Sequence, residues 1–406
     1  MPPAEPARSV APTLSPSVAS LALVVDDAVA ADAEALRRLC RDIHANPELR
    51  FEEVKASAWV CELLAARGFA VERGMAGMPT SFAARAGKPG GPSVAILAEY
   101  DALPHIGHAC GHNLIATGAV GAFLAAAKGA EAAGGEVVLL GTPAEEGGGG
   151  KIKMLEAGCF AGLDAAIMFH PFDRDILAHP ALASLWVTFT FHGKPAHAAA
   201  APHDGNSALT ACMDTFRLVD GQRVHFRDGV RVHGFITNGG QAVNIIPELA
   251  ACEFGVRAKD GRELERVRAI VERCARGAAM ASGVEVEVSS RTGYSAMRNN
   301  LTLARRFGDH LASGGRTADE VTDQVGAGST DMGDVSQAVP AIHPYLAICD
   351  VGESLCHEHR FAECAGSERG FATALDGARA LAKTALELLV DAELRRAVRA
   401  EFDAQR

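Results

Sequence analysis

The chain has 406 residues, of which 48% are hydrophobic and 22% are charged, the composition of a globular protein with about two to three domains. Its formal net charge of -11 argues against a nucleic-acid partner, because proteins that bind nucleic acid usually carry basic patches. No apolar run reaches the roughly 18 residues of a membrane span, so we expect no membrane partner either.

The N-terminal segment is rich in Pro, Ala and Ser and lacks both an apolar core and a basic start, so we expect no secretory signal. We predict a flexible N-terminal extension over residues 1–28. The ten cysteines follow no regular framework, which fits reduced thiols better than a set of disulfides. Together these features predict a cytoplasmic protein.

Helix and strand patterns alternate between residues 29 and 182. Apolar residues recur with helical spacing over 29–45, 56–67, 114–127 and 152–157. Short, continuously apolar runs, which are typical of strands buried on both faces, lie at 94–98, 137–140 and 165–169. The alternation predicts an α/β fold in which a mostly parallel sheet carries helices on both faces.

The pattern changes at about residue 183. Alternation of apolar and polar residues predicts half-exposed strands at 184–191, 232–237, 252–257 and 284–289, separated by helical stretches at 207–219 and 263–280. The parallel pattern resumes afterwards, so we expect an inserted α+β domain over 183–294. The main domain then comprises residues 29–182 and 295–406.

Cys110 and His112 are the first candidates for a metal site. They lie two residues apart, so in an extended segment the thiolate and the imidazole point to the same face. Sulfur and imidazole nitrogen together favour zinc or a similar borderline ion. A buried cysteine beside a core histidine would show the same spacing, so the assignment depends on further ligands elsewhere.

Further candidates follow the predicted strands. Asp101 follows the first of these strands, Glu145 and Glu146 follow the second, and His170 follows the third. Open α/β sheets bind ligands at this edge. Adjacent carboxylates can divide the tasks of binding a metal and acting as a base, although Glu145 and Glu146 could also form a solvated acidic turn.

His357 completes the candidate ligands, with His359 as a rival in the same loop. Each histidine alone could equally be a capped or solvated residue. Together the candidates supply enough ligands for a two-metal centre with one bridging group. Such a centre lowers the pKa of a shared water and polarises a carbonyl, as amide hydrolysis requires.

Five segments, in order along nearly the whole chain, resemble those of the M20 family of metallopeptidases and amidohydrolases, in the branch with a cysteine in its metal site. They are HANPEL at 44–49, EYDALP at 99–104 together with HACGHN at 108–113, TPAEEG at 142–147, KPAH at 194–197 and GSTDMG at 328–333. The last of these, together with IHP at 342–344, is most similar to the aminobenzoyl-glutamate hydrolase and β-alanyl dipeptidase group.

The resemblance implies a dinuclear centre of two divalent metal ions, zinc by preference, with manganese or cobalt as alternatives. Its implied ligands, in a pairing that stays open, are Cys110, His112, Glu146, His170 and His357. Cys110 would bridge the two ions. Glu145 would act as the general acid/base on a metal-bridging water, and Asp101 would support the ligands.

The resemblance also implies that the inserted domain is a lid and dimerisation domain. His197 would reach the active site of the partner subunit of a homodimer and steady the oxyanion, whereas a plain surface histidine is the alternative. Asn244 would bind the substrate. From its position at the end of a predicted strand of the inserted domain, Arg257 would pair with a carboxylate of the substrate or form a structural salt bridge. His105 departs from the relatives, which tend to have a smaller residue there, and would touch the substrate or be a solvated loop residue.

The implied reaction is cleavage of an amide C–N bond in a small-molecule substrate, such as a dipeptide or an N-acyl amino acid. Two alternatives stay open. A hydrolytic deaminase acting on an aromatic or amidine carbon would release ammonia. A non-catalytic homologue acting as a binding protein would hold no metal and show no metal-stimulated activity.

Overall fold

The computed structural model describes residues 16–322 and 327–405. Contacts divide the chain into two compact units. The first unit comprises Met1–His179, Arg298–Gly326 and Val335–Arg406, and the second comprises Pro180–Met297 and Ala327–Asp334. The insertion expected at 183–294 falls inside the second unit, which also takes in a short segment from the C-terminal half of the chain.

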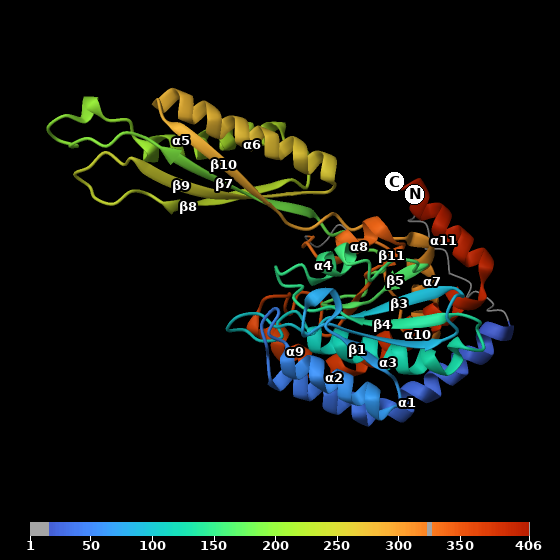
Figure 1. The fold of residues 1–406 in the computed structure, drawn as a ribbon. Helices are drawn as coiled ribbons and strands as arrows, with labels where there is room; N and C mark the ends of the chain where they lie inside the picture. The colour runs from blue at the N-terminus through green and yellow to red at the C-terminus, as the bar shows by residue number, and fades with distance from the viewer. Residues whose placement is uncertain (1–15, 323–326, 406) are drawn as a thin grey trace, which may run out of the picture. The chain divides into compact units, whose positions relative to one another are not determined.

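A six-stranded sheet forms the centre of the first unit (Figure 1). Its order is β1 (Val71–Arg73), β2 (Phe82–Gly87), β4 (Glu136–Gly141), β3 (Ser93–Ala98), β5 (Ala165–Ile167) and β11 (Ala341–Ile342). The neighbours β4, β3, β5 and β11 run parallel, whereas β1 and β2 pair antiparallel at one edge. The largely parallel α/β sheet expected from the sequence is therefore confirmed. A small parallel sheet joins β6 (His170–Phe172) to β12 (Tyr345–Ala347).

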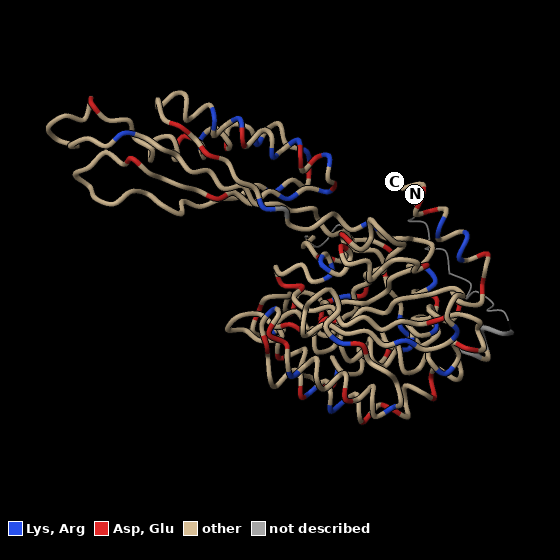
Figure 2. Tube along the Cα trace, in the orientation of Figure 1, with Lys and Arg blue, Asp and Glu red and all other residues tan. Residues whose placement is uncertain are grey.

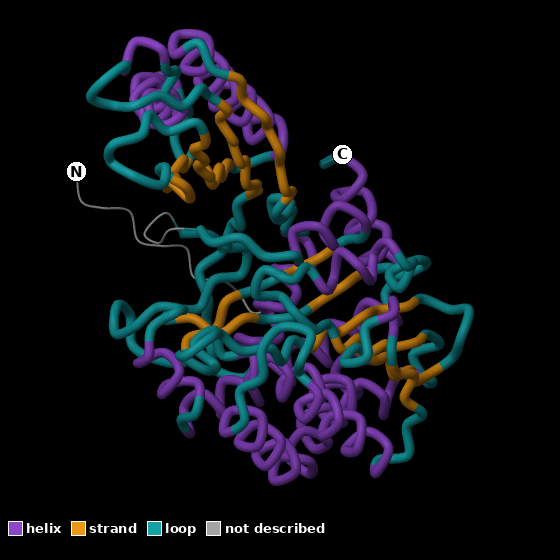
Figure 3. The backbone as a smooth tube through the Cα atoms, turned by 60° about the vertical axis from the view of Figure 1, so that its left-hand side comes forward, coloured by secondary structure: helices purple, strands orange, loops and turns teal. Residues whose placement is uncertain are grey.

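Helices lie on both sides of the strands of the first unit (Figure 3). They are α1 (Pro16–Ala45), α2 (Val54–Ala66), α3 (His112–Ala130), α4 (Gly150–Glu156), α7 (Leu301–Ser313), α8 (Met332–Ala338), α9 (His359–Ala365), α10 (Glu368–Val390) and α11 (Ala392–Ala404), of which α8 crosses the boundary between the units. Helices α3 and α10 pack on each other and on β3, and α1 packs against both helices.

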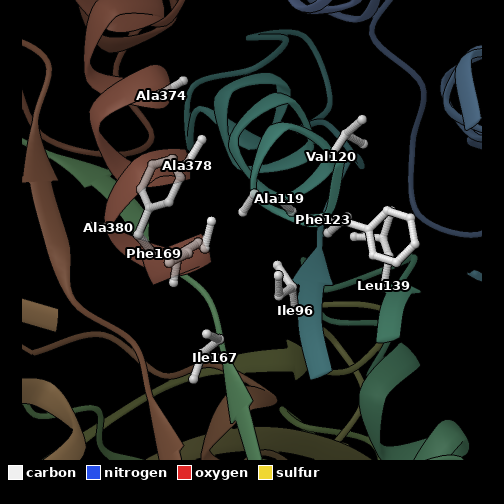
Figure 4. Close-up of a cluster of buried hydrophobic side chains, with 14 of the residues drawn as sticks. Ile96, Ala119, Val120, Phe123, Leu139, Ile167, Phe169, Ala374, Ala378 and Ala380 are labelled. Atoms are coloured by element: carbon white, nitrogen blue, oxygen red, sulfur yellow. The ribbon is translucent and has the colours of Figure 1, made fainter. Parts of the chain in front are cut away.

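Small residues let α3 and α10 approach the sheet closely around Phe169 (Figure 4). A Cβ on Gly118 of α3 would lie 2.3 Å from Phe169 Cε1, and one on Gly377 of α10 would lie 2.8 Å from Phe169 Cδ1. Ala119 and Ala378 are fully or almost fully buried beside them. The alanine and glycine content of these helices is therefore a packing requirement, because native cores leave no room for an extra methyl group.

Helix α1 begins earlier than its sequence pattern indicates. We expected a flexible extension over residues 1–28, but the helix begins at Pro16, and Val25 and Val29 are buried in the core. Lys383 of α10 donates a hydrogen bond to Asp26 at 2.9 Å. The expectation is thus wrong for residues 16–28, where tertiary packing extends the helix, and residues 1–15 lie outside the described part of the chain.

By length and composition alone, α3 is apolar enough to cross a membrane, although we expected no such run from the sequence. Its apolar window is 89% buried inside the protein. The helix packs against β3, β4, α1 and α10, so its hydrophobicity is explained by its place in the core of the first unit.

The second unit is an antiparallel sheet covered by two helices. The strand order is β10 (Glu285–Thr292), β7 (Ala183–His192), β9 (Leu249–Ala258) and β8 (Arg231–Asn238), and the helices are α5 (Ala208–Gln222) and α6 (Gly261–Ser282). Alternate residues of β7, including Val187, Phe189 and Phe191, are buried under these helices. The outer face of α6 carries acidic and basic residues in alternation (Figure 2), and Arg268 pairs there with Glu272.

Candidate metal centre

Residues that follow β3 and β4 meet the start of α3 in the first unit. Asp101 follows β3, and Glu145 and Glu146 follow β4. Helix α3 begins directly after Gly111, whose φ of +74° is the left-handed conformation that glycine tolerates best. A Cβ on this glycine would lie 2.8 Å from Pro171 Cγ. The turn therefore depends on glycine for both its backbone conformation and its close packing.

Two groups of potential metal ligands share Cys110. In each group the ligand atoms lie within 4.8 Å of one another. One group contains Cys110, His112 and His170, and the other contains Cys110, Glu146 and His357. The structure thus brings all five expected ligands together, with the thiol common to both groups.

Asp101 orients His112. The His112 Nδ1 and Asp101 Oδ1 atoms lie 3.1 Å apart, and Asp101 Oδ2 accepts a hydrogen bond from the Glu146 N–H at 2.9 Å. Burial opposes ionisation of Asp101, but His112 and the Glu146 N–H outweigh it and lower the pKa of this carboxyl. A carboxylate on Nδ1 leaves Nε2 of the ring for a metal, as is common for metal-binding histidines.

Backbone contacts hold the ring of His170 and the main chain of His357. His170 Nδ1 donates to the Pro171 carbonyl at 2.7 Å, which leaves Nε2 as its ligand atom. Burial and the neighbouring His112 lower the pKa of His170 to about 4, so the ring is neutral at pH 7 and able to bind a cation. His357 has a φ of +73°, and its N–H donates to the Ala109 carbonyl at 2.9 Å.

Buried polar atoms in this cluster fit a bound cation. Within the described residues, His112 Nε2 and Glu146 Oε1 are buried without a hydrogen-bond partner. Leaving such an atom unpaired costs about 1–3 kcal/mol. Glu146 Oε1 lies 3.6 Å from His357 Nε2, too far for a normal hydrogen bond. Contact with Cys356, burial and Glu146 raise the pKa of Cys110 well above its usual range, and a metal would be needed to hold it as a thiolate.

A buried ion pair that was not among the residues predicted from the sequence lies beside this cluster. Lys151 Nζ donates to Glu99 Oε1 at 2.5 Å, and both side chains are completely buried. Glu99 Oε2 lies 3.5 Å from His112 Nε2. Glu99 directly follows β3 and Lys151 directly follows the glycine run after Glu146, so their positions offered a signal, but their contact depends on the fold.

Glu145 lies next to the ligands. One of its carboxylate oxygens is within 4.8 Å of ligand atoms of both His112 and Glu146, and its side chain is largely buried. The preceding residue, Ala144, has a φ of +62°, which is unusual for a residue with a Cβ. Strained backbone of this kind often occurs at functional sites.

The remaining candidate residues lie outside this cluster. His105 and His359 are exposed residues of the first unit, and His359 begins α9. His197, Asn244 and Arg257 belong to the second unit. There, the segments of His197 and Asn244 lie side by side, since the Ala198 N–H donates to the Asn244 carbonyl at 3.0 Å. Arg257 donates to Ser329 Oγ at 3.4 Å, which joins it to the GSTDMG segment.

A separate group of potential ligands, Cys349, Glu353 and Cys364, also lies in the first unit. Its carboxylate is already held by the Arg360 guanidinium at 2.6 Å and by the Asp350 N–H at 3.0 Å. Burial raises the pKa of Cys349 to about 12 and keeps this thiol protonated. Hydrogen bonds within the protein therefore explain the arrangement of these three residues.

The sequence is similar to several hydrolases. The model of the peptidase family M20/M25/M40 matches residues 95–386. The chain is 39% identical to Xaa-Arg dipeptidase of Mus musculus over 98% of this chain and 95% of the relative. It is 30% identical to a p-aminobenzoyl-glutamate hydrolase subunit of Escherichia coli (strain K12), over 91% of this chain and 92% of the relative.

Solved structures share the fold. A dinuclear metal-binding peptidase of the M20 family from Bacillus subtilis superposes with a TM-score of 0.69 at 21% identity, covering 88% of this chain and 99% of that one. An aminobenzoyl-glutamate utilization protein from Klebsiella pneumoniae gives 0.65 at 19% identity, covering 89% and 98%. Since the family model spans most of the chain and the curated relatives cover nearly all of it, the chain belongs to the peptidase family M20/M25/M40 and is a hydrolase of the metallopeptidase and amidohydrolase type.

Proposed function

We propose that this hydrolase uses two divalent metal ions to cleave an amide bond in a dipeptide or an N-acyl amino acid. The proposal rests on one observation. Cys110 belongs to both groups of ligand atoms, and the two groups together contain the five expected ligands. The ligands are Cys110, His112, Glu146, His170 and His357. A Bacillus subtilis protein of the same fold, described as a dinuclear metal-binding peptidase, supports the same interpretation.

The mixture of thiol, imidazole and carboxylate favours zinc, while manganese or cobalt would also fit the nitrogen and oxygen ligands. When bound, the ions would activate a water and polarise the carbonyl of the substrate. Asp101 keeps His112 in the tautomer that offers Nε2 to a metal. Glu145 lies beside the ligands, where it can take a proton from the attacking water and deliver it to the departing amine.

The relatives narrow the substrate class. Two relatives named Xaa-Arg dipeptidase are 39% and 38% identical to this chain over most of its length. The similarity to a p-aminobenzoyl-glutamate hydrolase is lower, at 30%. Dipeptides with a basic C-terminal residue are therefore our first choice of substrate. We propose Asn244, Arg257 and His105 as substrate-binding residues.

We further propose that the protein is a cytoplasmic homodimer joined through its second unit. Strand β8 ends the strand order of that unit, so one of its edges is open within the described chain. Phe235 and Ile236 on β8 are 60% and 41% exposed. An open strand edge with apolar side chains can pair with a second copy about a two-fold axis. His197 would then act at the active site of the partner subunit.

A hydrolysis screen after metal reconstitution tests this function. Its arms are Xaa-Arg and Xaa-Lys dipeptides, N-acyl amino acids and p-aminobenzoyl-glutamate, with release of the free amine followed by chromatography. We expect metal-dependent cleavage, fastest for the basic dipeptides. Ammonia release from substrates without a peptide-like amide would indicate a deaminase instead. A protein that binds no metal and cleaves none of these substrates would contradict the proposal.

A further inference from the structure

Glu53 is a buried carboxylate outside the group of metal ligands. It lies directly before α2, and the residue is 0% exposed. Oε1 accepts hydrogen bonds from the N–H groups of Phe51 at 2.8 Å and Ala144 at 2.9 Å. Oε2 accepts a hydrogen bond from the Thr80 hydroxyl at 2.9 Å. This one side chain therefore joins three segments that are distant in sequence.

One of these segments carries Glu145. Ala144 precedes it in the left-handed conformation, with a φ of +62°, which costs a residue with a Cβ about 1–2 kcal/mol. On the other side, the N–H of Glu146 donates to Asp101 Oδ2 at 2.9 Å. The amides of both residues that flank Glu145 are thus held by buried carboxylates, Glu53 on one side and Asp101 on the other.

The Ala144 N–H is closed to bulk solvent. Ala144 is 0% exposed, so removal of the carboxylate takes away the acceptor that this N–H has in the native protein. The hydrogen bonds that Ala144 makes inside its own loop use its carbonyl, which accepts from Gly148 N–H at 3.1 Å. Burial also raises the pKa of Glu53 to about 7, because the environment disfavours the charged form. The protein nevertheless places a carboxyl group at this position.

We infer that Glu53 is a positioning residue for the catalytic glutamate: by accepting the Ala144 N–H, it holds the strained turn that fixes the place of Glu145 beside the metal ligands. The inference rests on the proposed role of Glu145 as the general acid/base. It assigns no chemistry to Glu53 itself. A displacement of a catalytic group by about 1 Å can lower turnover on the order of 100-fold, so support for this turn would matter for rate.

The substitutions Glu53→Ala and Glu53→Gln separate the hydrogen bond from the charge. Alanine removes the acceptor of the Ala144 N–H. Glutamine keeps an oxygen that can accept from both N–H groups, while its amide nitrogen faces the Thr80 hydroxyl, which can turn to accept. Glu53→Asp is the further variant if the alanine protein does not fold, because the shortened side chain cannot reach all three donors.

Hydrogen exchange of the Thr142–Gly148 loop is the first readout, because it reports the turn without any substrate. In Glu53→Ala we expect exchange in this loop to rise at least about tenfold, with the metal content unchanged, since opening of the turn exposes amides now closed. In Glu53→Gln we expect exchange close to that of the wild type. Unchanged protection in the alanine and aspartate variants would overturn the inference.

Steady-state kinetics on the best substrate is the second readout. We expect Glu53→Ala to lower kcat by about 10- to 100-fold with KM changed less than about threefold, and Glu53→Gln to restore kcat to within about threefold of the wild type. An equal loss of kcat in the glutamine and alanine variants would show that the charge matters rather than the hydrogen bond, and would also overturn the inference.

A matched control distinguishes this role from general destabilisation. Glu387 is another buried glutamate of the first unit, paired with Arg306 and His310 away from the loop. Glu387→Gln should lower the melting temperature but leave loop exchange and kcat unchanged. If the wild type hydrolyses none of the substrates, the proposed function fails, while hydrogen exchange still decides whether Glu53 holds the turn.

Discussion

Cys110 is the residue that the two groups of potential metal ligands share. Its thiol is buried, and its raised pKa shows that the apoprotein favours the protonated form. Metal binding must therefore displace a proton from sulfur, which makes the affinity for metal depend on pH. Glu145 differs from the proposed ligands in its proposed role, which is proton transfer, and the two functions can be separated by substitution.

Replacing Glu145 with glutamine should abolish turnover and spare the metal. The amide cannot accept the proton of the attacking water, so we expect kcat to fall by about 10²- to 10⁴-fold. Metal content, measured by elemental analysis, should match the wild type. Glu156→Gln, an exposed glutamate on α4, serves as the control and should retain full activity. Near-normal activity of Glu145→Gln would remove Glu145 from its role.

The pKa of Glu53 predicts a pH dependence of stability. Burial raises this pKa from 4.5 to about 7, so between these pH values the unfolded chain loses a proton that the native protein keeps. The contribution to stability is therefore full below pH 4.5 and declines as pH rises to about 7. Between pH 5 and pH 8 this amounts to about 2–3 kcal/mol.

Urea unfolding of the metal-free protein at these two pH values measures this difference. The wild type should lose about 2–3 kcal/mol more stability on going to pH 8 than Glu53→Gln does, because the amide does not titrate. The contributions of the other titrating groups are the same in both proteins, so they cancel in this comparison. The same pH dependence in both proteins would contradict the prediction.

Among the elements, the turn that opens α3 has the strictest requirements. Gly111→Ala should destabilise the first unit by about 2–4 kcal/mol, since a Cβ adds the cost of a left-handed residue and an overlap with Pro171. Gly134 provides the control, with a φ of +75° and no atom within 4 Å of its added Cβ. Gly134→Ala should cost only about 1–2 kcal/mol. Equal losses of stability in the two variants, measured by urea unfolding, would show that the structure relieves the overlap with Pro171.

Strands whose burial leaves a clear pattern of apolar residues were predictable from the sequence. The apolar runs at 94–98 and 137–140 became β3 and β4 within one residue at each end, because continuous burial leaves a clear pattern. The antiparallel edge formed by β1 and β2 and the short pair of β6 and β12 left no such pattern, since their pairing depends on distant segments.

The candidate metal site shows the same difference between residues in a visible sequence pattern and residues that only folding brings together. Residues in compact motifs, such as Cys110 and His112, could be proposed because their spacing fits a shared metal and further candidate ligands follow the predicted strands. Glu53, Glu99 and Lys151 could not, because each acts through a partner that only folding brings near. Glu53, for example, meets Ala144 across 91 residues of chain. Sequence reasoning therefore reached the proposed ligands and Asp101, which contacts His112, but not the supporting residues that lie outside the motifs.

At the scale of the whole molecule, the metals should stabilise the fold. Ions that bind the native state and not the unfolded chain raise stability by about 2.7 kcal/mol for each site at a free concentration 100 times Kd. Chelation should therefore lower the melting temperature of the first unit by several degrees, and added zinc should restore it. Identical melting curves with and without chelator, in a protein shown to contain metal, would contradict this coupling.

The proposed dimer also makes a prediction for the whole molecule. Phe235→Lys places a charge on the open edge of β8 and should shift the mass measured by light scattering from dimer to monomer. Val351→Lys changes an apolar residue of the first unit that is 66% exposed and should leave the mass unchanged. If His197 acts across subunits, the monomer should lose most of its activity. A fully active monomer would refute that role.

The insertion of the second unit has a consequence for the synthesis of the protein. Four of the five proposed ligands precede Pro180, where the second unit begins, and His357 follows it. A ribosome must therefore complete the whole inserted unit before the chain can supply the last ligand. The second unit has its own hydrophobic core, so it can fold during translation while the metal centre is still incomplete. The proposed metal centre is thus expected to assemble late, after the second unit has been synthesised.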